Sequence, residues 1–234
     1  MIKVENIDVW GFEHAIRGMR NPLNSWDKSD SEPAFHALEN FAADDPNAEK
    51  YREWNDKYGL NFKLGPNDLD LMQRLYKAGP EHRKYLRQIF ISLDITAPLY
   101  WWKEFDTYKI GTVSNSCSTM HKIHAKEFTV DDFSLEHVTE GNLAGFKECV
   151  LGCLNTARDN FLETKDKKWW WQMIQLLPSS YNQKRTITMN YENAVTMIRQ
   201  RTGHKLDEWN EFVDILKGLP YLSTITEKAS DDHA

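Results

Sequence analysis

The sequence of 234 residues has little of what marks several large classes of protein. It holds only three cysteines, Cys117, Cys149 and Cys153, an odd number without C-x-x-C spacing, which suits a reducing compartment. No segment approaches the roughly 18 apolar residues of a membrane helix. The charged N-terminal segment lacks the apolar run of a signal peptide. These absences predict a soluble, cytoplasmic protein that does not enter membranes.

An excess of positive charge is also missing. The 29 Lys and Arg residues are outnumbered by 35 Asp and Glu residues, giving a formal net charge of −6. A general nucleic-acid binder normally shows a basic face, so we expect no nucleic-acid partner. A small anionic ligand held by a few placed cations remains compatible with this composition. We find no internal repeat, linker or low-complexity segment, and we therefore expect one domain spanning residues 1–234.

Apolar residues at helical spacing and capping residues predict that most of the chain is helical. The expected helices cover residues 31–45 with Ser31 as N-cap, 46–58, 67–78 with Asn67 as N-cap, 98–108, 142–163 with an extension or restart up to Pro178, 191–202 with Asn190 as N-cap, and 206–216. Residues 226–234 are expected to be a frayed tail.

Two segments change to the period of a strand. Ile89, Ile91, Leu93 and Ile95 alternate with other residues, and residues 184–189 form a second β-branched run. Alternation of this kind is typical of a half-buried strand. The whole pattern predicts an α+β fold that is mostly helical.

A polar stretch follows the predicted helix of residues 98–108. It gathers hydroxyl, amide and thiol groups in Asn115, Ser116, Cys117, Ser118 and Thr119. A loop of this composition can hold a phosphate or a nucleobase through neutral hydrogen bonds. It can equally be an ordinary turn, because the same residue types are common there.

Two histidines and the two remaining cysteines are expected to have structural roles and not chemical ones. His121 and His124 are three residues apart, but no third ligand stands at a supporting spacing, so we predict no metal site. Cys149 and Cys153 lie on an otherwise apolar helix and are expected to be buried structural thiols.

Arg201 continues an apolar helical stripe. By the helical period it follows Ala194, Met197 and Ile198 on one face, whereas Arg199 points elsewhere. An inward guanidinium needs an anion or an acceptor as its partner. That partner is either a structural carboxylate or a ligand, and the pattern alone leaves both open.

The residues around Arg201 carry a resemblance to a known family. Residues 177–203, LPSSYNQKRTITMNYENAVTMIRQRTG, resemble the C-terminal part of the flavin-dependent thymidylate synthases, the ThyX family. In that family a Leu-Pro pair leads through a strand to an Asn, and a helix follows that ends in an Arg-containing turn. Asn190 and Arg201 match this pattern without a gap. Upstream segments are also similar, over residues 97–120, 79–95 and, loosely, 14–26.

The signature motif of the family is altered in this chain. The family has Arg-His-Arg and then Ser-x-Asn-Glu-x-Ser-x-Arg-Tyr. Here Thr107, Tyr108 and Lys109 form the first triplet. The later positions are Thr112 for the first Ser, Ser114 and Asn115 for Asn-Glu, Cys117 for the second Ser, and Thr119 and Met120 for Arg-Tyr. Only Lys109 keeps a cation. The resemblance therefore supports the fold more strongly than it supports the exact reaction.

The resemblance implies a ThyX-like α+β fold with a central, mainly antiparallel sheet. It implies conversion of dUMP to dTMP with FAD as cofactor, and methylenetetrahydrofolate and NADPH as co-substrates. The partners it implies are a pyrimidine deoxynucleotide, the folate and three further copies of the chain in a homotetramer with shared sites. Residues 30–65 lack the likeness and are expected to be a helical insertion particular to this chain.

The resemblance also implies roles for individual residues. Arg201 would be catalytic, stabilising the charge that develops on the pyrimidine. The implied flavin-binding residues are His82, Thr107, Tyr108, Lys109, Asn190, Glu192 and Thr196. The implied substrate-binding residues are Glu104, Asn115, Ser116, Cys117, Ser118, Thr119 and Arg201.

Three functions stay open at this level. The first is a flavin-dependent thymidylate synthase, and the second is an enzyme that modifies a pyrimidine nucleotide differently, for example by hydroxymethylation. The third is a non-catalytic nucleotide-binding homologue. The lost arginines and glutamate of the motif favour the second and third functions, whereas the retained Asn190, Arg201 and His82 favour the first two. A thiolate of Cys117 acting as a nucleophile is a further alternative, although no activating base adjoins it in the sequence.

Overall fold

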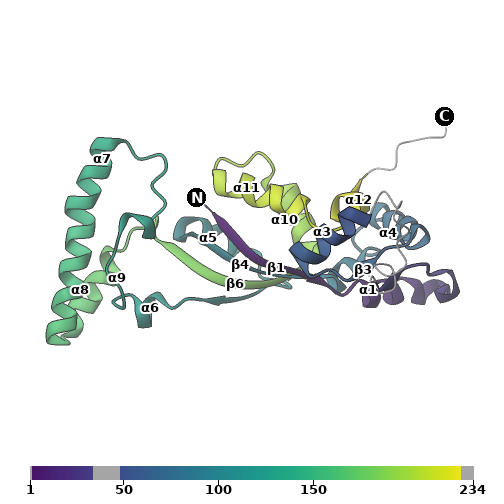
Figure 1. Cartoon of the computed structure of the whole chain (residues 1–234), viewed down its shortest axis with the longest axis horizontal. Helices are drawn as coiled ribbons and strands as arrows, with labels where there is room; N and C mark the ends of the chain where they lie inside the picture. Colours follow the sequence, from purple (N-terminus) through teal and green to yellow (C-terminus); the bar gives the residue numbers. More distant parts are fainter. Residues whose placement is uncertain (1, 34–47, 228–234) are drawn as a thin grey trace.

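The computed structural model describes residues 2–33 and 48–227 (Figure 1). The strands are β1 (Lys3–Trp10), β2 (Glu32–Pro33), β3 (Phe62–Lys63), β4 (Phe90–Pro98), β5 (Val113–Ser116) and β6 (Asn182–Asn190). The principal helices are α1 (Phe12–Arg20), α3 (Ala48–Tyr58), α4 (Pro66–Ala78), α5 (Leu99–Phe105), α6 (Thr119–Lys122), α7 (Glu140–Gly145), α8 (Gly152–Thr164), α9 (Lys167–Leu176), α10 (Tyr191–Arg201), α11 (Asp207–Lys217) and α12 (Leu222–Thr226). Shorter helical turns are η1 (Asn21–Leu23), η2 (Trp26–Lys28), η3 (Lys84–Gln88), η4 (Val130–Asp132) and η5 (Phe146–Leu151). The predicted α+β class is confirmed.

The main sheet has the order β1-β4-β6-β5, and every neighbouring pair is antiparallel. The predicted alternation in β4 is confirmed, because Ile91, Leu93 and Ile95 are fully buried while Phe90 is exposed. The second predicted strand is confirmed as β6. Strands β1 and β5 were not expected. Every residue of β5 is exposed, so this edge strand carries none of the apolar alternation by which a strand is recognised.

One face of the sheet supports the larger hydrophobic core. Trp101 and Trp102 of α5 are fully buried, and the ring of Trp101 lies 4.8 Å from that of Trp209 in α11. The indole N–H of Trp102 donates to the backbone oxygen of Gln183 in β6 at 2.9 Å. The tryptophan pair therefore packs in the core.

A second hydrophobic cluster lies among η5, α8 and α9, which Figure 1 shows at one end of the molecule. Leu154, Ala157 and Met173 are its buried centre. The prediction that Cys149 and Cys153 are buried is wrong, because both are exposed. Each lies one residue before a core position of the same helical run, and one residue turns a helix by about 100°.

The opposite end of the molecule is organised by a buried ion pair. Arg20 Nε donates to Asp68 Oδ1 at 2.6 Å, and Arg20 Nη1 donates to the backbone oxygen of Ser25 at 3.0 Å. The second oxygen of Asp68 accepts from Ser29 and Ser31. Burial raises the pKa of Asp68, but these hydrogen bonds outweigh burial and hold it below its ordinary value. The pair thereby ties the segment after α1 to α4.

Several predicted helix limits change here. The helix expected from Ser31 does not begin there, because Glu32 and Pro33 pair with β3 and the Ser31 hydroxyl is used by Asp68. The rest of that expected helix lies outside the described residues, as does the frayed tail from residue 228 on. Helix α4 begins two residues early, with Gly65 as N-cap and Pro66 in the first turn. Helix α12 was not expected. None of the described helices is long and apolar enough to cross a membrane.

Candidate functional site

A cavity of about 970 Å³ opens where η3, the turn after α5 and the start of α10 meet. It is lined by Arg87, Phe90, Thr107, Tyr108, Lys109, Ile110, Gly111, Asn190, Glu192, Asn193 and Thr196. Six of the seven residues assigned to flavin binding by resemblance lie in this list. The seventh, His82, is exposed and is not a lining residue. We call this space the α10 cavity.

The N-terminus of α10 is built by a reciprocal cap. Asn190 Oδ1 accepts from the backbone N–H of Asn193 at 3.1 Å, and Asn193 Oδ1 accepts from the backbone N–H of Asn190 at 3.2 Å. Asn193 Nδ2 also donates to the backbone oxygen of Ile110 at 2.8 Å. The predicted cap by Asn190 is confirmed, and it joins α10 to the turn before β5.

Gly111 makes the close approach of this turn possible. Its φ is +77°, and a Cβ at this position would lie 2.7 Å from Asn190 Nδ2. Asn190 is only 7% exposed, yet its Nδ2 group makes no hydrogen bond within the described residues. The cavity wall therefore holds an amide donor that has no hydrogen-bond partner among the described residues. The Nδ2 atom itself is not fully buried, so it is open to a ligand acceptor in the cavity.

The carboxylate of Glu192 is already paired. Arg83 donates to both of its oxygens, at 2.8 and 3.0 Å, and the guanidinium of Arg83 stacks on Tyr76. Both side chains of the pair are mostly buried. The fork geometry holds η3 against α10, and it cancels the negative charge that Glu192 would bring to the cavity.

Arg201 faces inward, as its place on the stripe predicts, and its acceptor is Glu104. Arg201 Nη1 donates to Glu104 Oε2 at 2.6 Å, and Arg201 Nε donates to the Tyr108 hydroxyl at 2.9 Å. The guanidinium lies 4.6 Å from the ring of Trp209, whose Nε1 also donates to Glu104 Oε2 at 3.0 Å. Within the chain, the carboxylate of Glu104 thus fills the role of a structural partner. Tyr108 connects this cluster to the α10 cavity, because it also lines the cavity.

The polar stretch of the altered motif does not line the α10 cavity. Asn115 and Ser116 belong to the edge strand β5, where they pair with Thr186 and Arg185 of β6. Cys117 continues this pairing, and its thiol is exposed. The loop expected here is therefore a strand followed by α6. Ser118 is the N-cap of α6, its hydroxyl accepting from the backbone N–H of His121 at 3.0 Å, and α6 begins at Thr119.

The described residues hold no cluster of three metal-ligating side chains. His121 is exposed, whereas the ring of His124 packs against Phe161.

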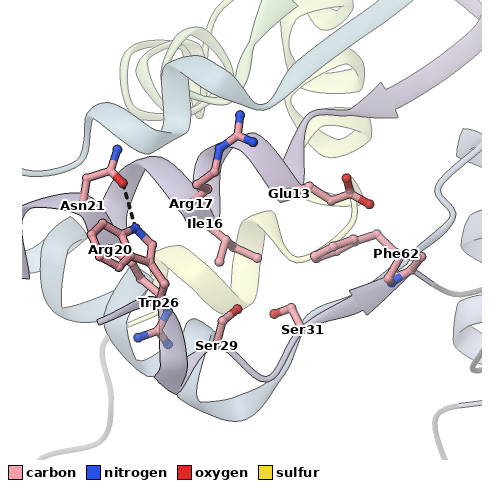
Figure 2. A pocket seen from close by; sticks show the side chains of 10 residues that line it. Glu13, Ile16, Arg17, Arg20, Asn21, Trp26, Ser29, Ser31 and Phe62 are labelled. Atoms are coloured by element: carbon pink, nitrogen blue, oxygen red, sulfur yellow. Dashed lines mark hydrogen bonds between the residues drawn. The ribbon is translucent and has the colours of Figure 1, made fainter. Parts of the chain in front are cut away.

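A second cavity, of about 790 Å³, lies beside α1 (Figure 2). Ile16 and Phe62 are buried in its wall. Trp26 is half exposed, and its indole N–H donates to Asn21 Oδ1 at 2.8 Å, which fixes the ring (Figure 2). The serine hydroxyls at its base are already used by Asp68. None of the residues that the sequence assigned to a site lines this cavity.

The sequence reasoning missed Arg87, Phe90, Ile110, Gly111 and Asn193 as cavity residues. Two of them carried a usable signal. Asn193 is the third residue after the N-cap Asn190, which is the place of the second member of a capping box. Gly111 stands between a predicted helix and a polar run, where a turn is expected. Arg87 and Phe90 have no such signal.

No protein-family model matches this sequence, and no curated protein matches it. Solved structures do match its fold, among them two of one enzyme. A crystal structure of thymidylate synthase X from Helicobacter pylori with FAD and dUMP has a TM-score of 0.62 at 15% identity, with 96% of each chain covered. A second structure of the same Helicobacter pylori enzyme complexed with FAD and dUMP has a TM-score of 0.60 at 14% identity, covering 94% of this chain and 98% of that one. The chain therefore has the fold of the flavin-dependent thymidylate synthase ThyX.

Proposed function

We propose that this protein binds a flavin, FAD, in the α10 cavity and acts as a thymidylate-synthase-like enzyme. One observation carries the proposal. Residues assigned to flavin binding from two distant segments, 107–109 and 190–196, line one cavity in a fold shared with proteins that bind FAD and dUMP. The cavity volume of about 970 Å³ lies at the upper end of the range for small-molecule sites.

The residues present fit a flavin nucleotide. The unpaired Nδ2 donor of Asn190 is available to a ligand oxygen, and Gly111 leaves room beside it. Phe90 and Tyr108 offer aromatic surface, and Lys109 brings a cation. When bound, a reduced flavin supplies the hydride for the reaction. His82 lies outside this cavity within one chain, so its proposed flavin contact requires a site completed by another copy.

The proposed reaction transfers a one-carbon unit from methylenetetrahydrofolate to C5 of dUMP, with NADPH as the electron source. In this proposal Arg201 stabilises the charge that develops on the pyrimidine. Glu104 now holds the guanidinium at 2.6 Å, and its side chain is about one-third exposed, so it can exchange places with a ligand acceptor. The exposed Asn115, Ser116, Cys117 and Ser118, with the partly buried Thr119, then contact substrate at a site shared between copies of the chain.

The first test is the visible absorbance of the purified protein. We expect a flavin band, or its appearance when FAD is added to the protein and the excess is removed. The variant Gly111→Val fills the space beside Asn190 in the cavity wall and is expected to lose the flavin band. Colourless protein that takes up no FAD at any concentration tried would rule the proposal out.

A second candidate is a non-catalytic nucleotide-binding homologue. It is favoured by the engagement of Arg201 with Glu104 and by Thr119, which stands where the family motif has an arginine. Formation of dTMP from dUMP, with folate, FAD and NADPH supplied, separates the two candidates. Bound dUMP without product supports the non-catalytic candidate, and a product other than dTMP indicates a different modification of the nucleotide.

A further inference from the structure

The α10 cavity is lined by two cations that have no partner among the residues described. Arg87 and Lys109 are exposed, and neither makes an ion pair or a hydrogen bond within the described part of the chain. The carboxylate in the wall, Glu192, is neutralised by Arg83 at 2.8 and 3.0 Å. The cavity therefore carries a net positive charge in a protein whose net charge is −6. Such a local reversal of sign concentrates an anionic ligand.

The backbone that carries Arg87 is firmly held. Arg87 lies in η3, where the two residues before it, Tyr85 and Leu86, are buried. The Tyr85 hydroxyl donates to the backbone oxygen of Met72 at 2.7 Å. Strand β4 begins three residues later, at Phe90. A charged side chain on an anchored segment loses little additional backbone freedom when it grips a ligand.

The rest of the wall suits a phosphorylated heteroaromatic molecule. Asn190 contributes its unpaired Nδ2 donor although the residue is 7% exposed. Phe90 contributes an aromatic face that Trp10 supports from the neighbouring strand, with ring centroids 5.7 Å apart and an interplanar angle of 23°. The cavity thus offers cations, a neutral donor and a stacking surface together, which are the groups that bind the phosphate and the ring of a nucleotide.

We propose that Arg87, together with Lys109, binds the phosphate of the flavin nucleotide and makes the site selective for phosphorylated flavins over riboflavin. The proposal rests on the proposed function in taking the ligand to be a flavin. It assigns a specificity-determining role to Arg87, which neither the motif nor the family resemblance indicates. Lys109 is the one cation retained in the altered motif, and Arg87 supplies the second.

The test compares the affinities of the full-length protein for FAD, FMN and riboflavin, measured by quenching of flavin fluorescence. The wild-type protein should bind FAD or FMN at least about tenfold more tightly than riboflavin, because a charge-assisted phosphate contact stabilises only the phosphorylated ligands. Arg87→Ala should lose most of this preference and leave the riboflavin affinity unchanged. Arg87→Lys should retain part of it. Arg199→Ala removes an arginine from α10 that does not line the cavity, and it should bind all three like the wild-type protein.

The outcomes separate this proposal from the proposed function. Flavin binding that Arg87→Ala leaves unchanged, or weakens equally for all three ligands, overturns the role of Arg87 and keeps the flavin site. A wild-type protein that binds no flavin overturns the proposed function, and calorimetry with inorganic pyrophosphate then decides the phosphate site. Pyrophosphate binding that is lost in Arg87→Ala supports it, and its absence in the wild-type protein overturns it.

Discussion

Arg201 is held in place by three aromatic or acidic neighbours. Its guanidinium forms an ion pair with Glu104, donates a hydrogen bond to the Tyr108 hydroxyl and lies over the ring of Trp209. The side chain is 18% exposed, so the charge is substantially desolvated and cannot be left without an acceptor. A substrate that used Arg201 would have to replace the oxygen of Glu104 with one of its own. The structural and the catalytic roles of this arginine are therefore distinguishable by substitution.

Arg201→Lys keeps the charge opposite Glu104 but removes the planar contact to Tyr108 and the stack on Trp209. If Arg201 is catalytic, formation of dTMP should fall by about 10²–10³, as for loss of one electrostatic donor. The free energy of unfolding should fall by only about 1 kcal/mol. Turnover, dUMP affinity and thermal unfolding measure these effects, and Arg199→Lys is the exposed control. Unchanged dUMP binding beside a clear loss of stability would make Arg201 part of the scaffold.

Asp68 gives a second prediction at the level of a single residue. It is fully buried and accepts from Arg20, Ser29 and Ser31. Asp68→Asn removes the charge that compensates Arg20, and we expect a loss of about 3 kcal/mol in the free energy of unfolding. Asp70→Asn breaks an exposed pair with Arg74, 65% exposed on both sides, and should change stability by less than about 1 kcal/mol. Denaturant unfolding compares the two, and similar losses would contradict the assigned role of Asp68.

Among the elements, the start of α10 and the turn before β5 depend on each other. The Asn193 side chain donates a hydrogen bond to the backbone oxygen of Ile110, and Gly111 lies against the side chain of Asn190. The cap therefore serves both the helix and the cavity wall. A change in the turn is expected to disturb both the stability of α10 and the binding of a ligand.

Gly111→Ala and Gly203→Ala test this coupling as a pair. Both glycines have positive φ, +77° and +72°, so each substitution carries a similar backbone cost of about 1 kcal/mol. A Cβ at Gly203 meets nothing within 4 Å, whereas one at Gly111 meets Asn190 Nδ2 at 2.7 Å. We expect Gly111→Ala to be the more destabilising and to weaken flavin binding, with Gly203→Ala leaving binding intact. Equal behaviour of the two variants in thermal unfolding and flavin titration would argue against the coupling.

On the scale of the whole molecule, the sheet has one buried and one open face. Val113 and Phe90 are exposed on the open face, and Trp10 is stacked on Phe90. Ile110, in the turn before β5, is almost completely exposed. Exposed aromatic and aliphatic groups on an open face favour an interface there. The positions of His82 and of β5 outside the α10 cavity also favour a site that several copies complete.

The resemblance to the ThyX family implies four copies, and this open face is compatible with such contacts, so we expect a homotetramer. Light scattering coupled to size exclusion should give about four times the chain mass of 27.5 kDa at micromolar concentration. Val113→Lys places a charge on the open face and should shift the mass toward smaller species, because a buried unpaired charge is costly. Lys205→Glu, an exposed charge change elsewhere, should leave the tetramer intact. A monomer mass for the wild-type protein would remove the basis for shared sites.

Local patterns in the sequence were enough for the central elements. The alternation before Thr96 predicts β4, and Asn190 predicts the cap of α10, because both depend on residues close together in the chain. The resemblance added the two segments that meet in the α10 cavity. The stripe ending at Arg201 correctly predicts an inward guanidinium, since helical periodicity alone sets the face of a side chain.

Only the tertiary structure decided what these residues meet. Glu104 lies 97 positions from Arg201, and Arg83 lies 109 positions from Glu192. No local pattern predicts pairs at such separations. The strand β5 was missed because an edge strand exposed on both faces needs no apolar alternation. The sequence around Arg87 does not distinguish it from an ordinary surface cation. Its place in the cavity follows from the packing of η3 against α10. Local propensity thus determined the elements, and long-range packing determined the charge and the contacts of the site.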